Sequence, residues 1–269
     1  MASLPFRLNP YDHQRRALDF CSGRDYYALL MEQGTGKTFV AIYDAARRWP
    51  HIKGVVAFAP AGVHTNWILN EIPTHMPEGV PYRAAAYYAS PRKAEREALE
   101  HLFKEDGVPC LRILTVNWEA LVTKSGVDLI KRFLTTFDPI FMAGDESQRI
   151  KTPTAIRTKN FHKLKQYADV RMIMSGTAVL NSPWDAFSQF GFLDQDILEI
   201  RSFPAFKAEY AELLPPGHGL LRHIVARTNG KFIPQIVARD LDGNPKWRNL
   251  QQLDTLIDRH SFRVLKKDC

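Results

Sequence analysis

The chain has 269 residues, of which 45% are hydrophobic and 24% are charged, a composition typical of a globular protein with a buried core. No run of 18 or more apolar residues occurs, and the start of the chain lacks an apolar signal-peptide core, so neither a membrane span nor secretion is expected. The net charge of +7 permits a nucleic-acid partner without requiring one. Three widely spaced cysteines, Cys21, Cys110 and Cys269, argue against a disulfide framework and a structural metal.

Short apolar runs of strand length recur along the first two thirds of the chain. Most are continuous rather than alternating, as in strands that are buried on both faces of a parallel sheet. The runs cover residues 26–31, 54–60, 111–117, 139–146 and 170–177, with residues 81–90 as a further candidate strand. Helical patterns separate them, at residues 37–48, 65–75, 91–105, 118–137 and 154–167. This alternation predicts an α/β fold with a mostly parallel sheet and helices on both faces.

The pattern changes after about residue 194. Residues 202–214 are expected to form a helix, and residues 229–247 an irregular or hairpin-like excursion with a Gly-Asn-Pro turn. Residues 249–269 are expected to form a closing helix that frays into a basic tail. The sequence therefore predicts a mainly helical carboxyl-terminal extension.

The stretch "MEQGTGKT" follows the first apolar run and opens the first helical pattern. Gly34, Gly36, Lys37 and Thr38 fit the phosphate-loop pattern, although Met31 stands where its first glycine is expected. Backbone N–H groups of such a loop, including that of Thr35, can bind phosphate, with Lys37 at the outer phosphates and Thr38 on Mg²⁺. The alternative is a glycine turn that merely precedes a helix, but the strand and helix around the loop favour ATP and Mg²⁺ binding.

Two adjacent acids end the run at 139–146. Asp145 and Glu146 are expected at the carboxyl edge of the sheet, where open α/β sheets bind their ligands. Asp145 would hold Mg²⁺, and Glu146 would orient and deprotonate the attacking water. Two acids at a solvated strand end are the alternative. Together with the phosphate loop, they predict the second half of an ATPase site, with Lys37, Asp145 and Glu146 as catalytic residues.

Three segments, "EQGTGKT", "DESQRIK" and "MSGTAVLNSP", resemble motifs I, II and III of superfamily 2 helicase-like ATPases, in particular the Swi/Snf-type branch and its shorter bacteriophage members. The resemblance implies a RecA-like P-loop NTPase lobe. It implies that Gln14 reads adenine, and that Gln148, Ser175 and Thr177 couple ATP to DNA. The chain departs from the branch at Met31, which replaces an acid, at Gln148, which replaces His, and at Ala178, which replaces Pro.

"AFAPAGVHTNWILNEI" resembles motif Ia of the same branch. Its polar residues at a helix start, His64, Thr65 and Asn66, are the candidate contacts to a DNA phosphate. Trp67, Trp118 and Trp184 could stack on bases, but packing positions are expected for them. Since phosphate contacts carry no sequence information, no sequence preference is predicted.

The resemblance divides the chain into residues 1–195, lobe 1 with motifs Q, I, Ia, II and III, and residues 196–269, an extension leading to a missing second lobe. That lobe, expected in the same full-length chain, would supply an arginine finger worth roughly 10³–10⁵ in rate. The isolated chain is therefore expected to be a fragment with weak or no ATPase activity. The full-length protein would be an ATP hydrolase that translocates on or remodels DNA, with duplex DNA as the expected partner.

Two other readings stay open at this point. A solitary lobe could act as a non-catalytic module that binds nucleic acid or a partner. A P-loop GTPase is disfavoured because no guanine-reading N-K-x-D occurs, and a small-molecule kinase would not need "SGT" after the fifth strand. The expected location is the cytoplasm of a bacterial or phage-infected cell, or the nucleus only if the source is eukaryotic.

Overall fold

A computed structural model describes residues 4–176, 182–215, 217–227 and 235–269 of the chain. Within these residues one sheet of seven strands forms, and each neighbouring pair of strands is parallel. From edge to edge its strands are β3 (Tyr82–Ala86), β4 (Leu111–Asn117), β2 (Gly54–Ala59), β5 (Ile140–Gly144), β6 (Val170–Ser175), β1 (Tyr26–Met31) and β7 (Ser261–Val264). The predicted parallel α/β sheet is confirmed, and the candidate strand at 81–90 is present as β3.

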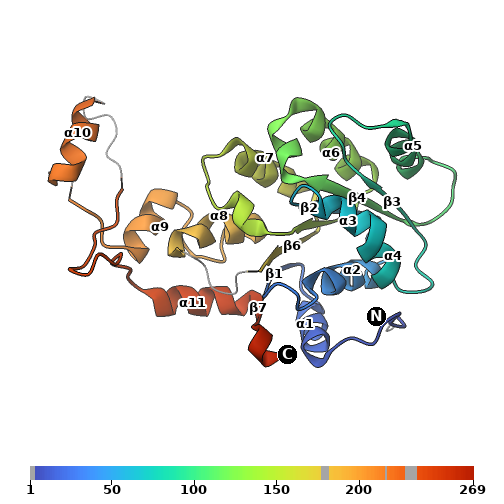
Figure 1. Cartoon of the computed structure of the whole chain (residues 1–269), viewed down its shortest axis with the longest axis horizontal. Helices are drawn as coiled ribbons and strands as arrows, with labels where there is room; N and C mark the ends of the chain where they lie inside the picture. The colour runs from blue at the N-terminus through green and yellow to red at the C-terminus, as the bar shows by residue number, and fades with distance from the viewer. Residues whose placement is uncertain (1–3, 177–181, 216, 228–234) are drawn as a thin grey trace.

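Helices cover both faces of the sheet (Figure 1). One hydrophobic cluster includes side chains from α1 (Asp12–Cys21), α2 (Lys37–Arg47), α4 (Ile72–His75) and the turn before α4. The cluster on the other face includes side chains from α5 (Lys93–Leu102), α6 (Lys124–Thr136), α7 (Ile156–Leu164) and α8 (Pro183–Leu193). The sheet is therefore the middle of three layers. None of the helices in the described part of the chain is long and apolar enough to cross a membrane.

Two predicted helices are interrupted by local structure. The stretch 118–137 divides into a 3₁₀ segment and α6, because Asn117 Oδ1 accepts from Ala120 N at 3.0 Å and Thr123 Oγ1 accepts from Gly126 N at 3.1 Å. Such side-chain caps start a new helical segment at each point. The helix predicted at 65–75 begins two residues earlier, with α3 (Val63–Asn66), and a π-helical turn joins α3 to α4.

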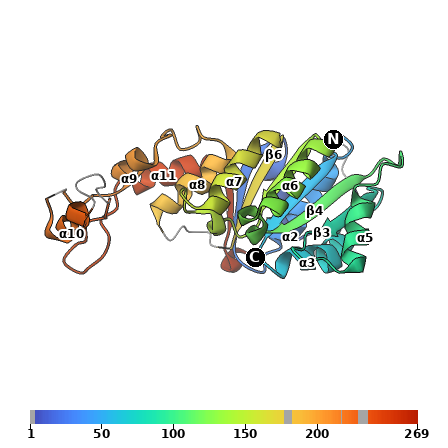
Figure 2. The ribbon, with the colours of Figure 1, turned by 90° about the horizontal axis from the view of Figure 1, so that it is seen from above.

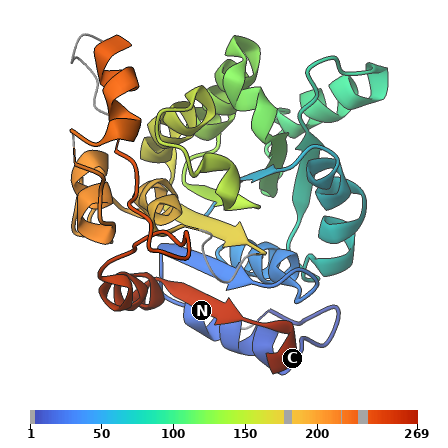
Figure 3. The ribbon, with the colours of Figure 1, turned by 60° about the vertical axis from the view of Figure 1, so that its left-hand side comes forward.

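The last strand corrects the prediction for the end of the chain. The closing helix α11 (Leu250–Arg259) ends at Arg259, and β7 then pairs in parallel with β1, where a fraying tail was expected. Ser261 and Val264 of β7 are buried, so this short strand does contribute to the core. Figure 3 shows β7 at the sheet edge, next to β1 and α1. The chain thus returns to the strand that precedes the phosphate loop.

The remaining elements extend away from the sheet. They are α9 (Phe203–Tyr210), α10 (Gly219–Arg227) and antiparallel bridges between Ala211 and Trp247, Leu213 and Val237, and Arg239 and Pro245. A turn at Asp240 to Gly243 closes the last bridge, so the hairpin-like prediction is confirmed for residues 235–247. Figure 2 shows α10 at the end of the molecule opposite α5.

The helix expected at 202–214 is present but ends at Tyr210. Because α9 and α11 share the core of α8, they are continuous with the lobe, and the division at residue 195 stays a prediction.

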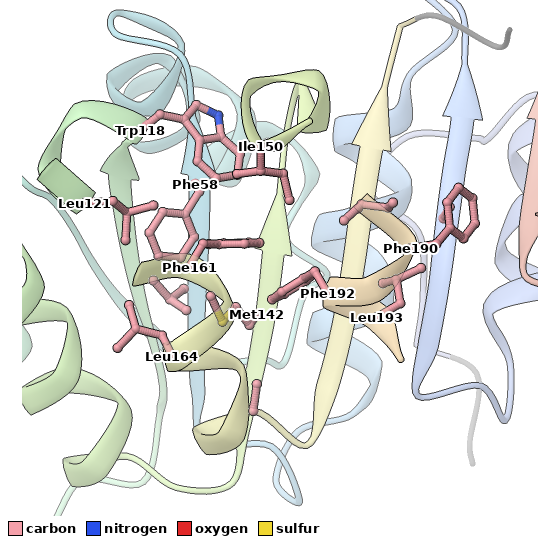
Figure 4. Packing of buried hydrophobic residues seen from close by; sticks show 14 of the residues in the cluster. Phe58, Trp118, Leu121, Met142, Ile150, Phe161, Leu164, Phe190, Phe192 and Leu193 are labelled. Carbon is pink, nitrogen blue, oxygen red and sulfur yellow. The ribbon is translucent and has the colours of Figure 1, made fainter. Parts of the chain in front are cut away.

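A cluster of aromatic side chains, which includes Phe58, Trp118 and Phe161, packs against β2 and β5 near the edge where the site is expected (Figure 4). Phe161 packs edge-on against Phe58 and Trp118, with ring centroids 5.0 Å apart in each pair. Trp118 is fully buried and donates its indole N–H to the backbone oxygen of Asp145 at 2.9 Å. A Cβ on Gly144 would lie 3.1 Å from the Trp118 ring, so glycine lets the ring approach β5. The core therefore fixes the backbone where the acidic pair begins. The expectation that Trp67 and Trp118 are packing residues is confirmed.

Candidate active site

The phosphate loop lies between β1 and α2, in the predicted strand–loop–helix context. Gly34 and Gly36 have φ of 88° and 82°, in the left-handed region that glycine enters without a steric penalty. Thr35 closes the loop, with its Oγ1 donating to the Glu32 backbone oxygen at 2.7 Å. Lys37 and Thr38 are the first residues of α2, where backbone N–H groups lack helical acceptors. The loop can therefore offer free donors and a positive helix end to a phosphate.

Helix α1 is fastened to this loop by two side chains. His13 Nε2 lies 2.9 Å from the Thr35 backbone oxygen, and Gln14 Nε2 donates to the same oxygen at 3.3 Å. Gln14 also accepts from Tyr11 N at 3.0 Å, so each end of its amide keeps one further hydrogen-bonding position. A Cβ on Gly36 would lie only 2.1 Å from Gln14 Nε2, which shows how closely the two pack. The adenine-reading role of Gln14 stays a prediction.

The acidic pair follows directly after β5. Asp145 is 4% exposed, and its N–H donates to the Phe58 backbone oxygen at 2.6 Å. Glu146 has φ of 52° and ψ of 55°, a left-handed conformation that costs a non-glycine residue about 1 kcal/mol or more. Its N–H donates to Asp145 Oδ1 at 3.0 Å. This local strain is one mark of a functional position.

Burial raises the pKa of Asp145 to about 6, against the lowering effect of Lys37 and with a further rise from Glu146. A buried carboxylate in this state lacks full compensation for its charge. The Lys37 ammonium, which lowers this pKa, makes its ion pair with Glu146, at 3.7 Å. Asp145 therefore has the properties expected of a cation ligand. Among the described residues no group of three or more His, Cys, Asp or Glu side chains could hold a metal ion.

A chain of polar contacts joins the three motif segments. Lys37 Nζ lies 3.7 Å from Glu146 Oε1, Gln148 Nε2 donates to Glu146 Oε2 at 2.7 Å, and Ser175 Oγ donates to Gln148 Oε1 at 3.2 Å. Gly176 closes the space between them, since a Cβ there would lie 3.6 Å from Glu146 Oε1 and 3.8 Å from Lys37 Nζ. The structure thus brings together Lys37, Asp145, Glu146, Gln148 and Ser175. Thr177, the third predicted coupling residue, lies outside the described residues.

The three candidate DNA contacts are placed differently from one another. His64 is 4% exposed, and its Nε2 lies 3.2 Å from the Tyr87 backbone oxygen, so its ring faces the protein interior. Thr65 and Asn66 are half-buried, with side chains bonded to the Gly62 backbone oxygen and to Glu71. A direct DNA contact therefore stays a prediction for Thr65 and Asn66. The buried His64 side chain instead connects this helix start to the backbone of Tyr87.

Two contacts at the site join distant segments and have no local sequence signal. The Trp118 indole anchors the Asp145 backbone, and Lys266, placed in a basic tail, lies beside the phosphate loop. The apolar positions of β7 were the one available signal for the return of the chain to β1, and they are too few to distinguish a strand from the end of a helix.

No protein-family model and no curated protein matches this sequence. Among solved structures, the whole chain aligns with the Sulfolobus solfataricus SWI2/SNF2 ATPase core in complex with dsDNA, at 17% identity and a TM-score of 0.67. It also aligns over its whole length with the Sulfolobus solfataricus SWI2/SNF2 ATPase core domain, at 19% identity and a TM-score of 0.58. The chain spans 47% of each of these two chains, about half their length. At such identities the likeness establishes the fold. The predicted RecA-like α/β fold is therefore confirmed for this chain.

Proposed function

We propose that this chain is the ATP-binding lobe of a Swi/Snf-type, DNA-dependent ATPase that couples ATP hydrolysis to movement along, or remodelling of, duplex DNA. The observation that carries the proposal is the line of contacts from Lys37 through Glu146 and Gln148 to Ser175. It joins three strand ends at one edge of a RecA-like sheet. A bare phosphate-binding loop has no need of such a connection.

The residues at this edge suit Mg·ATP. Loop N–H groups and Lys37 would bind the phosphates, and Thr38 and the buried Asp145 would hold Mg²⁺, which neutralises charge on the phosphates. Glu146 is 27% exposed at its side chain and keeps contact with solvent, as a residue that takes a proton from water requires. Gln148 would hold the Glu146 carboxylate in one orientation. Gln14 would read the adenine from α1.

The DNA part of the proposal has separate support. One of the solved structures that share this fold is, by its description, in complex with dsDNA. The net charge of +7 favours an anionic partner. Thr65 and Asn66 at the start of a helix are the proposed phosphate contacts. The second RecA-like lobe, with its arginine finger, is proposed to belong to the same full-length protein, so the 269-residue chain alone would hydrolyse ATP slowly.

The deciding experiment measures ATP hydrolysis by the full-length product and by residues 1–269, each without DNA, with duplex DNA and with single-stranded DNA. We expect hydrolysis by the full-length product that duplex DNA stimulates, and little or none from residues 1–269. Glu146→Gln is the matched variant, expected to retain ATP binding and lose hydrolysis. If the full-length product binds DNA but neither binds nor hydrolyses ATP, the non-catalytic module replaces the motor. Stimulation by single strands alone would instead support an unwinding enzyme.

A further inference from the structure

The segment that follows β7 is bonded to the start of the phosphate loop. Glu32 N donates to the Val264 backbone oxygen at 3.0 Å, and Lys266 N donates to Glu32 Oε2 at 2.6 Å. The two partners of the second bond are 234 residues apart in sequence. Glu32 thus connects the beginning of the loop to the last residues of the chain through both its backbone and its carboxylate.

Lys266 extends its side chain over this loop. A Cβ placed on Gly34 would lie 3.8 Å from Lys266 Cε, so the ammonium is next to the first glycine of the loop. Lys266 is exposed, and within the described ranges its ammonium makes no ion pair. The Glu32 carboxylate accepts the backbone N–H of Lys266 and leaves the ammonium available for another anion.

The charges at this edge of the sheet favour a role for the Lys266 ammonium in binding an anion. Three acids, Glu32, Asp145 and Glu146, stand near the loop, together with the cations Lys37 and Lys266. Lys37 is already paired with Glu146 at 3.7 Å. A polyphosphate brings further negative charge, so it would meet an excess of acid unless Mg²⁺ and a second cation compensate.

We propose that Lys266 is a second phosphate-contacting cation of the nucleotide site and that Glu32 positions it through its backbone N–H. This rests on the proposed nucleotide binding at the loop. Because Lys266 belongs to the segment after β7, nucleotide binding and docking of that segment stabilise each other by the same free energy. The state of the phosphate site is thereby transmitted to the stretch 265–269.

The test is calorimetric binding of Mg·ATP and of inorganic tripolyphosphate to the whole 269-residue chain. Lys266→Ala should weaken both about fivefold at low salt, the scale of one partly exposed charge pair, and less at high salt. Lys267→Ala, an exposed neighbour of equal charge, is the control and should bind like wild type. Lys266→Ala binding as tightly as wild type, or weakening no more than Lys267→Ala, overturns the proposal. A wild-type chain that binds neither compound overturns the proposed function itself, and a loss confined to Lys37→Ala overturns only the role of Lys266.

Positioning by Glu32 needs its own pair of variants. Glu32→Gln and Glu32→Ala both remove the negative charge, but only Glu32→Ala removes the side-chain acceptor for Lys266 N. We expect Glu32→Ala to bind tripolyphosphate about threefold more weakly than Glu32→Gln, as expected when one hydrogen bond is lost. The difference should disappear when both carry Lys266→Ala, because coupled residues are not additive. If Glu32→Ala and Glu32→Gln bind tripolyphosphate equally well while Lys266 is intact, Glu32 does not position the cation.

Discussion

Gln148 donates to Glu146 across 2.7 Å, and through this hydrogen bond the proposed catalytic carboxylate is held by the segment that also contacts Ser175. The branch that the sequence resembles usually has histidine at this position. A glutamine amide can donate to the carboxylate while its oxygen accepts from a hydroxyl, and both bonds are present here. The departure in motif II therefore preserves the connection between the ends of β5 and β6.

Gln148→Ala should separate hydrolysis from nucleotide binding. Loss of the amide frees the Glu146 carboxylate to rotate, so we expect kcat of the full-length product to fall about tenfold, less than the roughly 10²-fold that a fully misplaced catalytic group can cost. The affinity for Mg·ATP should change less than about twofold, because Lys37 and the loop are untouched. Steady-state kinetics and calorimetry measure the two quantities. Gln148→His, which can still donate, is the control, and an equal loss of affinity and kcat in Gln148→Ala would contradict this role.

Lys37→Ala should weaken Mg·ATP binding strongly while the fold survives. The ammonium is nearly buried, and the ion pair that it makes with Glu146 is long at 3.7 Å, so little stability depends on this pair. We expect a loss of affinity of about a hundredfold, as for a buried phosphate contact. Calorimetry measures binding, and circular dichroism monitors the fold. Lys93→Ala, on an exposed helix, is the control. If Lys37→Ala binds as tightly as wild type, the phosphate-loop assignment is wrong.

Local sequence was enough to predict the parts of the site that are continuous in the chain. The loop from Gly34 to Thr38 and the pair Asp145–Glu146 each adjoin a continuous apolar strand, and parallel strands bring their carboxyl ends to one edge. This convergence follows from topology alone. Five of the first six strands were predictable for the same reason, since each is a mostly buried run flanked by helical patterns, whereas β3 has only Ala85 and Ala86 buried and was a weaker candidate.

The remaining features depend on contacts between distant segments. The four residues of β7 follow a helix after a single residue and contain only two buried side chains, so their pairing with β1 decides their structure. The bond from Lys266 to Glu32 spans the chain, and the interior orientation of His64 depends on Tyr87 after β3. Tertiary packing overrides local preference in such short elements.

Gly36→Ala tests how tightly α1 is fitted to the phosphate loop. The added Cβ would lie 2.1 Å from Gln14 Nε2 and would also impose φ of 82° on a residue with a side chain. We expect the free energy of unfolding to fall by about 2–3 kcal/mol, of which roughly 1 kcal/mol is backbone strain. Gly23→Ala measures that strain alone, because φ there is 73° and no atom lies within 4 Å of the Cβ. Urea unfolding should show a smaller cost of Gly36→Ala in a Gln14→Ala background, and equal costs would exclude the steric contact.

The free energy of unfolding should also decrease as the pH falls, because His162 is buried in its neutral form. Burial, followed by the nearby Lys165, lowers the pKa of His162 from 6.5 to about 4, while its ring bonds to the Ser188 backbone oxygen at 2.9 Å. The folded state therefore disfavours the charged ring. The contribution of neutral His162 to the free energy of unfolding is fully present above pH 6.5 and is lost as the pH falls towards 4. Between pH 7 and pH 5 this amounts to about 2 kcal/mol of unfolding free energy.

The matched variant is His162→Gln, which can still donate to Ser188 but does not titrate. Urea unfolding at pH 7 and at pH 5 should show that wild type loses about 2 kcal/mol more than the variant over this interval. The variant should be less stable than wild type at pH 7, where the imidazole packs neutral against Phe192, and should approach or exceed it at pH 5. Parallel pH profiles for the two proteins would mean that the imidazole is protonated in the folded state without cost, and that its burial between α7 and α8 does not control the acid sensitivity of the lobe.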